Sequence, residues 1–136
     1  MSKKPLIDLV DITKSFDDTC VLDDLNLSIK ENEFLTLLGP SGCGKTTTLR
    51  ILGGFVTPDK GNVIFDGEDI TQVPPNKRNL NTVFQKYALF PHMSVKENIQ
   101  LGIQNLSKEE KDEITSKYLK KFKLEGFENR YPWQLS

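Results

Sequence analysis

The chain has 136 residues, of which 27% are charged and 37% are hydrophobic, which is the composition of about one ordinary globular domain rather than of a disordered tail or a fibre. Its 18 basic and 19 acidic residues leave a formal net charge of −1, so we expect no nucleic-acid partner, because such partners are bound by a basic field. No secretory signal, no membrane-spanning run and no metal-type cysteine cluster is visible, which favours a cytosolic compartment.

Two strands are predicted in the first part of the chain. Apolar and polar residues alternate over 24–29, which is the pattern of a half-buried strand. After a turn at Glu31–Asn32, the nearly continuous apolar run over 33–38 predicts a strand that is covered on both faces.

The middle of the chain predicts a helix and two short strands. The helix is expected over 46–52, with Gly53–Gly54 as its stop signal. Residues 62–65 predict a strand that turns at Asp66–Gly67, and residues 82–84 predict another short strand.

The last third of the chain is helical in character. Ser94 with Glu97, and Ser107 with Glu110, have the spacing of capping boxes at helix starts. Behind the second box, apolar side chains recur at helical spacing and are expected to face a core; they are Ile114, Tyr118, Leu119 and Phe122. The fold class is therefore α/β at the front with a helical part at the back.

A phosphate-binding loop is the sharpest motif in the sequence. Gly39 and Gly44 have the spacing of such a loop, Lys45 and Thr46 follow directly, and the loop stands between a predicted strand and a predicted helix. Lys45 would reach the β- and γ-phosphates of a nucleotide, and the Thr46 hydroxyl would bind Mg²⁺. The expected nucleotide contacts are Gly39, Pro40, Ser41, Gly42, Cys43, Gly44, Lys45, Thr46 and Thr47. A plain glycine turn before a helix would explain the glycines but not the Lys-Thr pair.

Two segments carry a resemblance to one family. Residues 34–50 resemble the Walker A region of ATP-binding-cassette (ABC) transporter ATPases, and residues 81–98 resemble the Q-loop segment of the same family. The resemblance covers residues 7–136 and implies ATP and Mg²⁺ as ligands. It also implies an incomplete P-loop NTPase fold, with a nucleotide-binding core and antiparallel β subdomain over 1–92 and the start of a helical subdomain over 93–136.

The resemblance assigns roles to further residues. Gln85 matches the Q-loop glutamine, which in the family touches Mg²⁺ and the attacking water, so Lys45 and Gln85 are the expected catalytic residues. Phe16 matches the position that stacks on adenine, although a single Phe beside a hairpin turn can equally pack in a core. The apolar segment 87–92 matches the surface that receives transmembrane permease subunits, and His92 is expected to be a loop residue or part of that contact.

The end of the sequence matches the beginning of the family's signature motif at Leu135–Ser136. We therefore expect an N-terminal portion of a longer ATPase, without the Walker B aspartate, the catalytic glutamate and the switch histidine. Residues 63–66 imitate a Walker B strand, but Gly67 follows where the glutamate belongs. Because family members complete each other's sites as head-to-tail dimers, this chain alone is expected to lack turnover.

The sequences of residues 68–78 and 81–93 look most like those of the ATPases of spermidine/putrescine importers, and similar sequences occur in sugar and iron importers. The resemblance implies an ATPase and translocase component that lies peripherally at the cytoplasmic face of the membrane. Two other functions remain open at this point. One is another P-loop enzyme, such as a small-molecule kinase, and the other is an ATP-binding or interaction module without turnover.

Overall fold

The computed structural model describes residues 4–84 and 88–135. The chain divides into two compact units, Met1–Thr82 and Val83–Ser136. This division follows packing, whereas the sequence-based boundary between residues 92 and 93 follows expected function and stays a prediction. No helix in the described ranges is both long enough and apolar enough to cross a bilayer.

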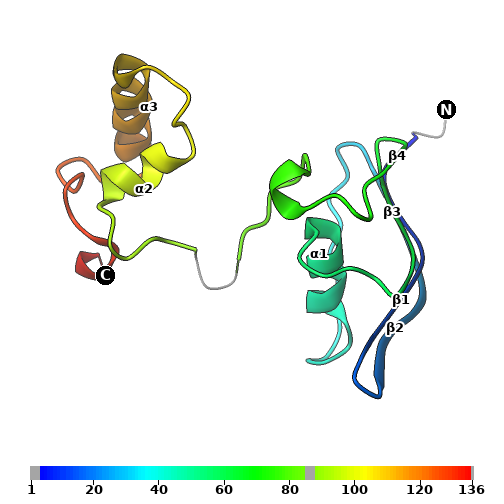
Figure 1. Cartoon of the computed structure of the whole chain (residues 1–136). Coiled ribbons are helices and arrows are strands. Elements are labelled where there is room, and N and C mark those ends of the chain that lie inside the picture. Colours follow the sequence, from blue (N-terminus) through cyan, green and yellow to red (C-terminus); the bar gives the residue numbers. More distant parts are fainter. Residues whose placement is uncertain (1–3, 85–87, 136) are drawn as a thin grey trace. The chain divides into compact units, whose positions relative to one another are not determined.

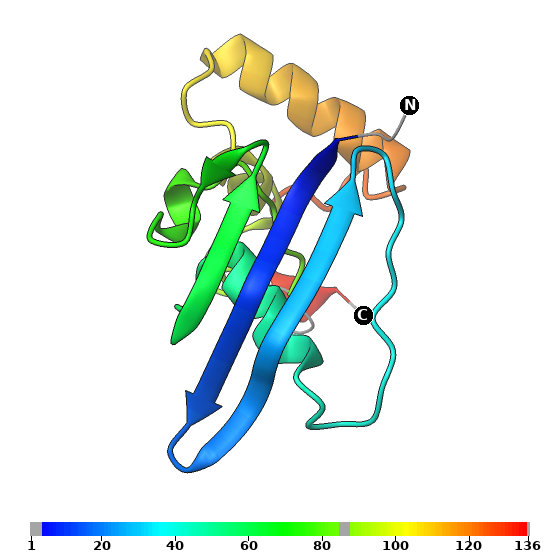
Figure 2. The same cartoon turned by 90° about the vertical axis from the view of Figure 1, so that its right-hand side faces the viewer.

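The first unit is an antiparallel sheet with one helix on its face. The sheet order is β2-β1-β3-β4, and Figure 2 shows the three longer strands side by side with α1 against one face (Figures 1 and 2). The elements are β1 (Pro5–Phe16), β2 (Thr19–Lys30), α1 (Lys45–Gly53), β3 (Lys60–Phe65), β4 (Glu68–Asp69) and the 3₁₀ helix η1 (Pro75–Lys77). The predicted strands over 24–29 and 62–65, the predicted helix and the turn at Asp66–Gly67 are confirmed.

The core of this unit lies between the sheet and α1. Ile51 of α1 is fully buried and packs with side chains from β1, β2 and β3. The buried cluster consists of Leu9, Ile12, Leu22, Ile51, Val63 and Ile70. Burial of this apolar surface fixes α1 on the sheet, and with it the loop that precedes α1.

Strand β1 contains an irregularity that the sequence pattern hides. Leu9 and Ile12 are both buried although they are three positions apart, because the register shifts between them and Asp11 adopts a φ of 51°. Gly61 of β3 lies against this bulge, where an added Cβ would stand 2.4 Å from the carbonyl oxygens of Val10 and Asp11. The bulge therefore requires glycine at position 61.

Two predicted strands do not form. Residues 33–38 have no strand structure, and Phe34 and Leu38 are 95% and 88% exposed. Residues 82–84 are also without strand structure, and Val83 is 86% exposed. A strand that is apolar on both faces needs neighbouring strands and covering layers, and no described residue of this chain pairs with either segment.

The second unit is built on two capped helices, α2 (Val95–Leu101) and α3 (Lys108–Lys121), followed by the 3₁₀ helix η2 (Pro132–Gln134). Both predicted capping boxes form. At α2, the Glu97 carboxylate accepts from the Ser94 amide at 2.7 Å, and the Ser94 hydroxyl accepts from the Glu97 amide at 3.2 Å. An ion pair of 2.9 Å between Lys96 and Asp112 links the two helices.

The apolar stripe on α3 is only partly buried. Leu119 is 2% exposed and Ile114 is half-buried, but Tyr118 and Phe122 are 44% and 64% exposed. The prediction that all four face a core is therefore wrong for these two aromatic rings, which stack on each other with centroids 6.4 Å apart. They border an apolar hollow of about 710 Å³ in this unit, so helical spacing identified the apolar face but not what covers it.

Candidate functional site

The glycine-rich loop ends at an α-helix whose first amides have no side-chain cap. Gly44 is the N-cap residue of α1, and the first turn of the helix contains no acidic side chain. The Thr48 amide donates to the Gly44 carbonyl at 2.9 Å, so the amides of Lys45, Thr46 and Thr47 precede the helical hydrogen-bond ladder. These amides and the positive end of the helix dipole form a site suited to an anion.

Gly44 holds this loop against the sheet. Its φ is 94°, and an added Cβ would stand 2.7 Å from Leu22 Cδ2 and 3.1 Å from the Val21 carbonyl oxygen. Both the backbone conformation and the close approach to β2 therefore require glycine. The Thr48 hydroxyl donates to the Gly44 carbonyl at 2.8 Å and fixes the same junction from inside the helix.

Lys45 folds back over the loop. Its ammonium group donates to the carbonyl oxygen of Gly39 and lies 3.5 Å from that of Pro40. A lysine in this position is a donor that can exchange a carbonyl oxygen for a phosphate oxygen with a small movement of its flexible stem. Thr46 is exposed at the first turn of α1.

The loop offers a nucleotide the groups that a triphosphate with Mg²⁺ needs. Uncapped amides, the Lys45 ammonium and the Thr46 hydroxyl all belong to one short segment. Within the described ranges, no carboxylate is hydrogen-bonded or ion-paired to residues 39–47, and no group of three or more His, Cys, Asp or Glu side chains could hold a metal. The amides, the ammonium and the hydroxyl of this segment are groups that suit the phosphates of MgATP, which themselves ligate the metal.

Phe16 lies at the end of β1 and is 45% exposed, so the ring is not buried in the core of this unit, and its stacking role stays a prediction. It pairs with Thr19 across the hairpin, while the loop residue Gly44 lies against Val21 and Leu22 of β2. This separation along β2 is about 10 Å at the usual rise of a strand. The structure thus brings the aromatic ring and the loop to the same end of the sheet.

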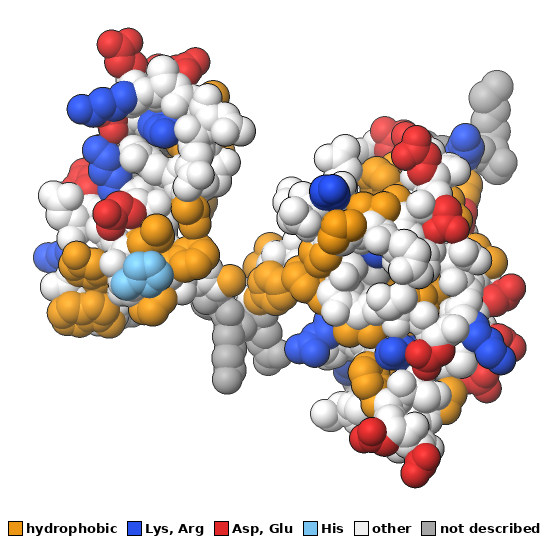
Figure 3. All heavy atoms as spheres, in the orientation of Figure 1, with side chains coloured by type: hydrophobic (Ala, Val, Ile, Leu, Met, Phe, Trp, Pro, Cys, Tyr) orange, Lys and Arg blue, Asp and Glu red, His pale blue; other side chains and the backbone are white. Residues whose placement is uncertain are grey.

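Gln85 lies outside the described residues, so its catalytic and metal-binding roles stay predictions. The described part of the segment that follows it is apolar and exposed, with Leu89 at 56% and Phe90 at 43%. The rings of Phe90 and His92 meet edge to face at 6.0 Å. Figure 3 shows the single histidine surrounded by hydrophobic side chains on the surface of the second unit.

Asn98 fixes this exposed loop, a role that sequence reasoning missed. Its Oδ1 accepts from the Phe90 amide at 2.9 Å, and its Nδ2 lies 3.1 Å from the carbonyl oxygens of Phe90 and Met93. Nδ2 also lies 3.0 Å from the Ser94 carbonyl. Nothing in the local pattern distinguishes Asn98 from a solvated helix residue, because all its partners are backbone groups of the loop.

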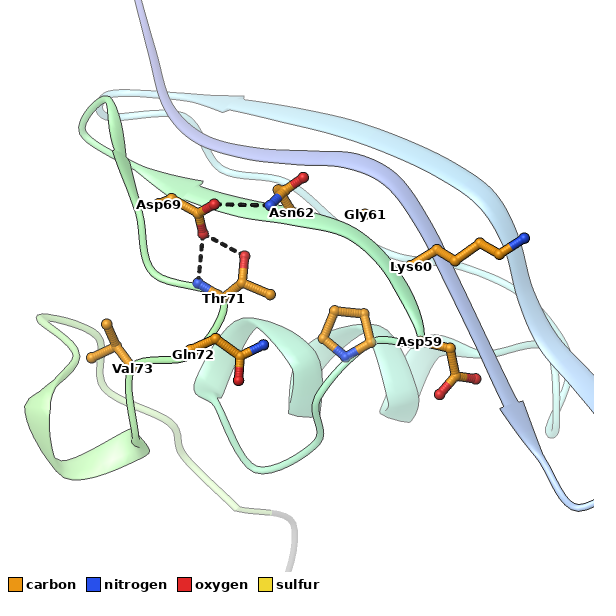
Figure 4. A pocket seen from close by; sticks show the side chains of 9 residues that line it. Asp59, Lys60, Gly61, Asn62, Asp69, Thr71, Gln72 and Val73 are labelled. Atoms are coloured by element: carbon orange, nitrogen blue, oxygen red, sulfur yellow. Dashed lines mark hydrogen bonds between the residues drawn. The ribbon is translucent and has the colours of Figure 1, made fainter.

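A separate hollow of about 420 Å³ lies in the first unit beside the start of β3 (Figure 4). Asp69 accepts there from Asn62 Nδ2 at 2.8 Å, from the Thr71 amide at 2.9 Å and from the Thr71 hydroxyl at 2.5 Å. The hydrogen bonds from Thr71 hold the pKa of Asp69 below its usual range. No residue of the predicted nucleotide site lines this hollow, and Asp69 serves to fix the segment after β4.

Comparison with known proteins agrees with the motifs. The family model described as "ABC transporter" matches residues 22–136. The chain belongs to the ABC transporter family. This membership excludes the small-molecule kinase. Residues 63–66 are not a Walker B strand. Asp66 and Gly67 form the β3–β4 turn, with φ of 48° and 81°, and no glutamate follows Asp66.

Two relatives are named "Spermidine/putrescine import ATP-binding protein PotA". The protein from Acetivibrio thermocellus is 55% identical over 100% of this chain and 39% of its own length. The protein from Clostridium novyi is 59% identical over 92% of this chain and 37% of its own length. The chain thus spans about two fifths of the length of these relatives.

Solved structures show the same fold. A dimeric ATP-binding cassette in a post-hydrolysis state, bound to ADP and Pi, matches with a TM-score of 0.81 and 32% identity, over 96% of this chain and 63% of that one. Another ATP-binding cassette of an ABC transporter matches with a TM-score of 0.82 and 27% identity, over 98% of this chain and 60% of that one. The predicted partial α/β fold of an ABC ATPase is therefore confirmed.

Proposed function

We propose that this chain binds MgATP through residues 39–47 and belongs to the ATP-binding subunit of an importer that takes up spermidine and putrescine. The observation that carries the nucleotide proposal is the uncapped start of α1 beneath the Lys45 ammonium. Amides of the loop and of the first turn of α1 hold the phosphates, and Lys45 moves from its loop carbonyls to the β- and γ-phosphate oxygens. Thr46 supplies a hydroxyl ligand to Mg²⁺, and Phe16 stacks on adenine.

Bound MgATP supplies the phosphoryl group whose transfer to water drives transport. Lys45 stabilises the negative charge on that group, and Gln85 orients the water and touches the metal, as its match to the Q-loop implies. These 136 residues alone bind MgATP without hydrolysing it, because no described carboxylate contacts the loop. A second ATPase subunit arranged head to tail completes the site.

We place the protein peripherally at the cytoplasmic face of the membrane, with the permease subunits contacting the segment after Gln85. The exposed side chains of Leu89, Phe90 and His92 support this contact, since a contiguous apolar surface suits the docking of a permease subunit. Polyamine as the cargo is supported by the names of the relatives from A. thermocellus and C. novyi. A sugar or iron importer is the alternative, because no residue of this chain is expected to touch cargo.

Calorimetric titration of MgATP tests the nucleotide proposal. Lys45→Ala is expected to abolish or strongly weaken binding, because it removes the only side-chain cation hydrogen-bonded to the loop among the described residues. Lys60→Ala is the matched control, since Lys60 is an exposed lysine on β3 of the same unit. Equal binding by the parent chain and both variants would reject the phosphate loop as the nucleotide site.

Uptake of radiolabelled spermidine tests the cargo. The protein is expressed with its permease and binding-protein partners in a bacterial strain that lacks its own polyamine importers. Uptake that depends on Lys45 supports the proposal. Uptake of maltose or ferric iron in place of spermidine, in parallel assays with the matching permeases, would assign the subunit to one of the related importers.

A further inference from the structure

A lysine lies over the ring that is proposed to stack on adenine. Lys14 precedes Phe16 by two positions on β1, so both side chains stand on the same face of the strand. The Lys14 ammonium nitrogen lies 5.3 Å from the centroid of the Phe16 ring, within the range of a cation–π contact. Because Phe16 is 45% exposed, the ring keeps free surface on which a planar group can stack.

Lys14 is itself held in place by the carboxylate of Asp59, the residue that directly precedes β3. The Lys14 ammonium forms an ion pair of 3.1 Å with Asp59 Oδ1, and the Lys14 side chain is only 17% exposed. The other carboxylate oxygen of Asp59 accepts from the Ser15 amide at 2.8 Å, and the Asp59 amide donates to the Thr13 carbonyl at 2.8 Å. Asp59 thus contacts three successive residues at the end of β1.

Asp59 does not belong to the polar network beside it. Figure 4 shows its carboxylate turned away from Asp69, Asn62 and Thr71, which are hydrogen-bonded to one another. The Ser15 amide and the Lys14 ammonium together hold the pKa of Asp59 below its usual range, so the carboxylate is ionised at neutral pH. Its two oxygens are committed to β1.

An exposed Phe beside a hairpin turn would otherwise sample several rotamers, and ordering it when a base binds would reduce affinity. A cation fixed over one part of the ring removes that freedom beforehand. We propose that Lys14 and Asp59 are positioning residues for the nucleotide base: Asp59 anchors the Lys14 ammonium, and Lys14 holds the Phe16 ring in the orientation that accepts adenine. This inference rests on the proposed stacking of adenine on Phe16.

The test compares MgATP with magnesium tripolyphosphate, which has the phosphates but no base, by calorimetric titration into the protein and its variants. Lys14→Met is expected to weaken MgATP binding by about 3- to 10-fold and to leave tripolyphosphate binding unchanged. Asp59→Asn should do the same, because it keeps an acceptor for the Ser15 amide but loses the ion pair. Lys14→Arg should keep the ATP affinity of the parent chain, since a guanidinium also binds over an aromatic ring.

The matched control is Lys30→Met, which removes the same charge at the opposite end of the sheet, where Lys30 pairs with Pro5. The proposal is overturned if Lys14→Met binds MgATP as Lys30→Met does. It is equally overturned if Lys14→Met weakens MgATP and tripolyphosphate by the same factor, since that result means a general loss of structure.

The variant Phe16→Leu distinguishes the positioning proposal from the adenine-stacking proposal on which it rests. If Phe16→Leu lowers the ratio of MgATP to tripolyphosphate affinity while Lys14→Met and Asp59→Asn do not, adenine stacking stands and the positioning role is rejected. If Phe16→Leu leaves the ratio unchanged, stacking itself is rejected, and the positioning role with it. Neither result bears on the proposal that MgATP binding depends on Lys45, which is tested separately.

Discussion

Arg78 Nη1 lies 2.9 Å from the carbonyl oxygen of Ile51, which joins the end of α1 to a residue 27 positions further along the chain. The same guanidinium donates to Leu52 at 2.9 Å, to Val73 at 2.7 Å and to Thr71 at 3.1 Å. Arg78 is 8% exposed, and burial lowers its pKa. A single side chain therefore caps the helix that carries Lys45 and ties it to the segment after β4.

Arg78→Met should destabilise the first unit by about 3 kcal/mol, because it leaves several buried carbonyl groups without a donor while keeping most of the apolar stem. Urea unfolding followed by circular dichroism measures the change. Arg50→Met serves as the control, since Arg50 is exposed on α1. A loss of stability no larger than that of Arg50→Met would show that the buried guanidinium does not hold α1.

Gly44→Ala should weaken MgATP binding by more than about 10-fold, because a left-handed residue with a Cβ carries strain of roughly 1–2 kcal/mol and this Cβ also meets β2. Gly42→Ala has a positive φ of 83° but no neighbour within 4 Å, so its effect should be smaller. Gly102→Ala, with open space and a φ of −76°, should change nothing. Equal affinities in all three variants, measured by titration, would reject the seating of the loop on β2.

Leu38→Ala should change the free energy of unfolding by less than about 0.5 kcal/mol, because the Leu38 side chain is 88% exposed. Ile51→Ala should cost about 3 kcal/mol, since Ile51 is fully buried in the core cluster. Denaturant unfolding of the two variants gives both values. A similar cost at both positions would show that residues 33–38 pack as a strand in solution.

The stability of the second unit should depend on pH through its capping boxes. The backbone and hydroxyl groups of Ser94 and Ser107 hold the pKa of Glu97 and of Glu110 below the usual glutamate range. A depressed carboxylate pKa stabilises the folded state above the unfolded value, about 4.3, and that stabilisation is lost as the pH falls through the folded value. Helix content should therefore decrease on acidification below about pH 4.3.

Replacing both glutamates by glutamine should flatten this acid dependence, because the amide oxygen still accepts the backbone hydrogen bond but does not titrate. Circular dichroism at 222 nm between about pH 2.5 and pH 6 measures it. Glu113→Gln, an exposed position on α3 outside both caps, is the control. An acid transition that is the same in the double variant and the control would contradict the capping account.

Local signals predicted the elements that local contacts make. The stop of α1 at Gly53–Gly54, the Asp66–Gly67 turn and both capping boxes depend on neighbours within a few residues, so the sequence pattern contains them. The proposed phosphate loop depends on local sequence in the same way, because residues 39–47 contain the uncapped amides, the Lys45 ammonium and the Thr46 hydroxyl in one segment.

Features that depend on distant partners were missed or misjudged. Strand β1 was not predicted, because the bulge at Asp11 interrupts the alternation of apolar and polar residues that identifies a strand. Residues 33–38 have the composition of a central strand, but a strand also requires neighbours, and none is present among the described residues. Arg78 and Asp59 look like solvated charges in the sequence, and only the folded chain shows the carbonyls, the amide and the ammonium that they bind.

The most direct test of the central claim is a titration of MgATP followed by ¹H–¹⁵N NMR of the labelled protein. If residues 39–47 bind the triphosphate and Phe16 receives the base, the largest amide shifts will fall on Gly42 to Thr47 and on the hairpin after Phe16. The Lys45→Ala variant will show none of them at the same nucleotide concentration. Shifts that cluster elsewhere in the chain, or that persist unchanged in the variant, would contradict the proposed nucleotide site.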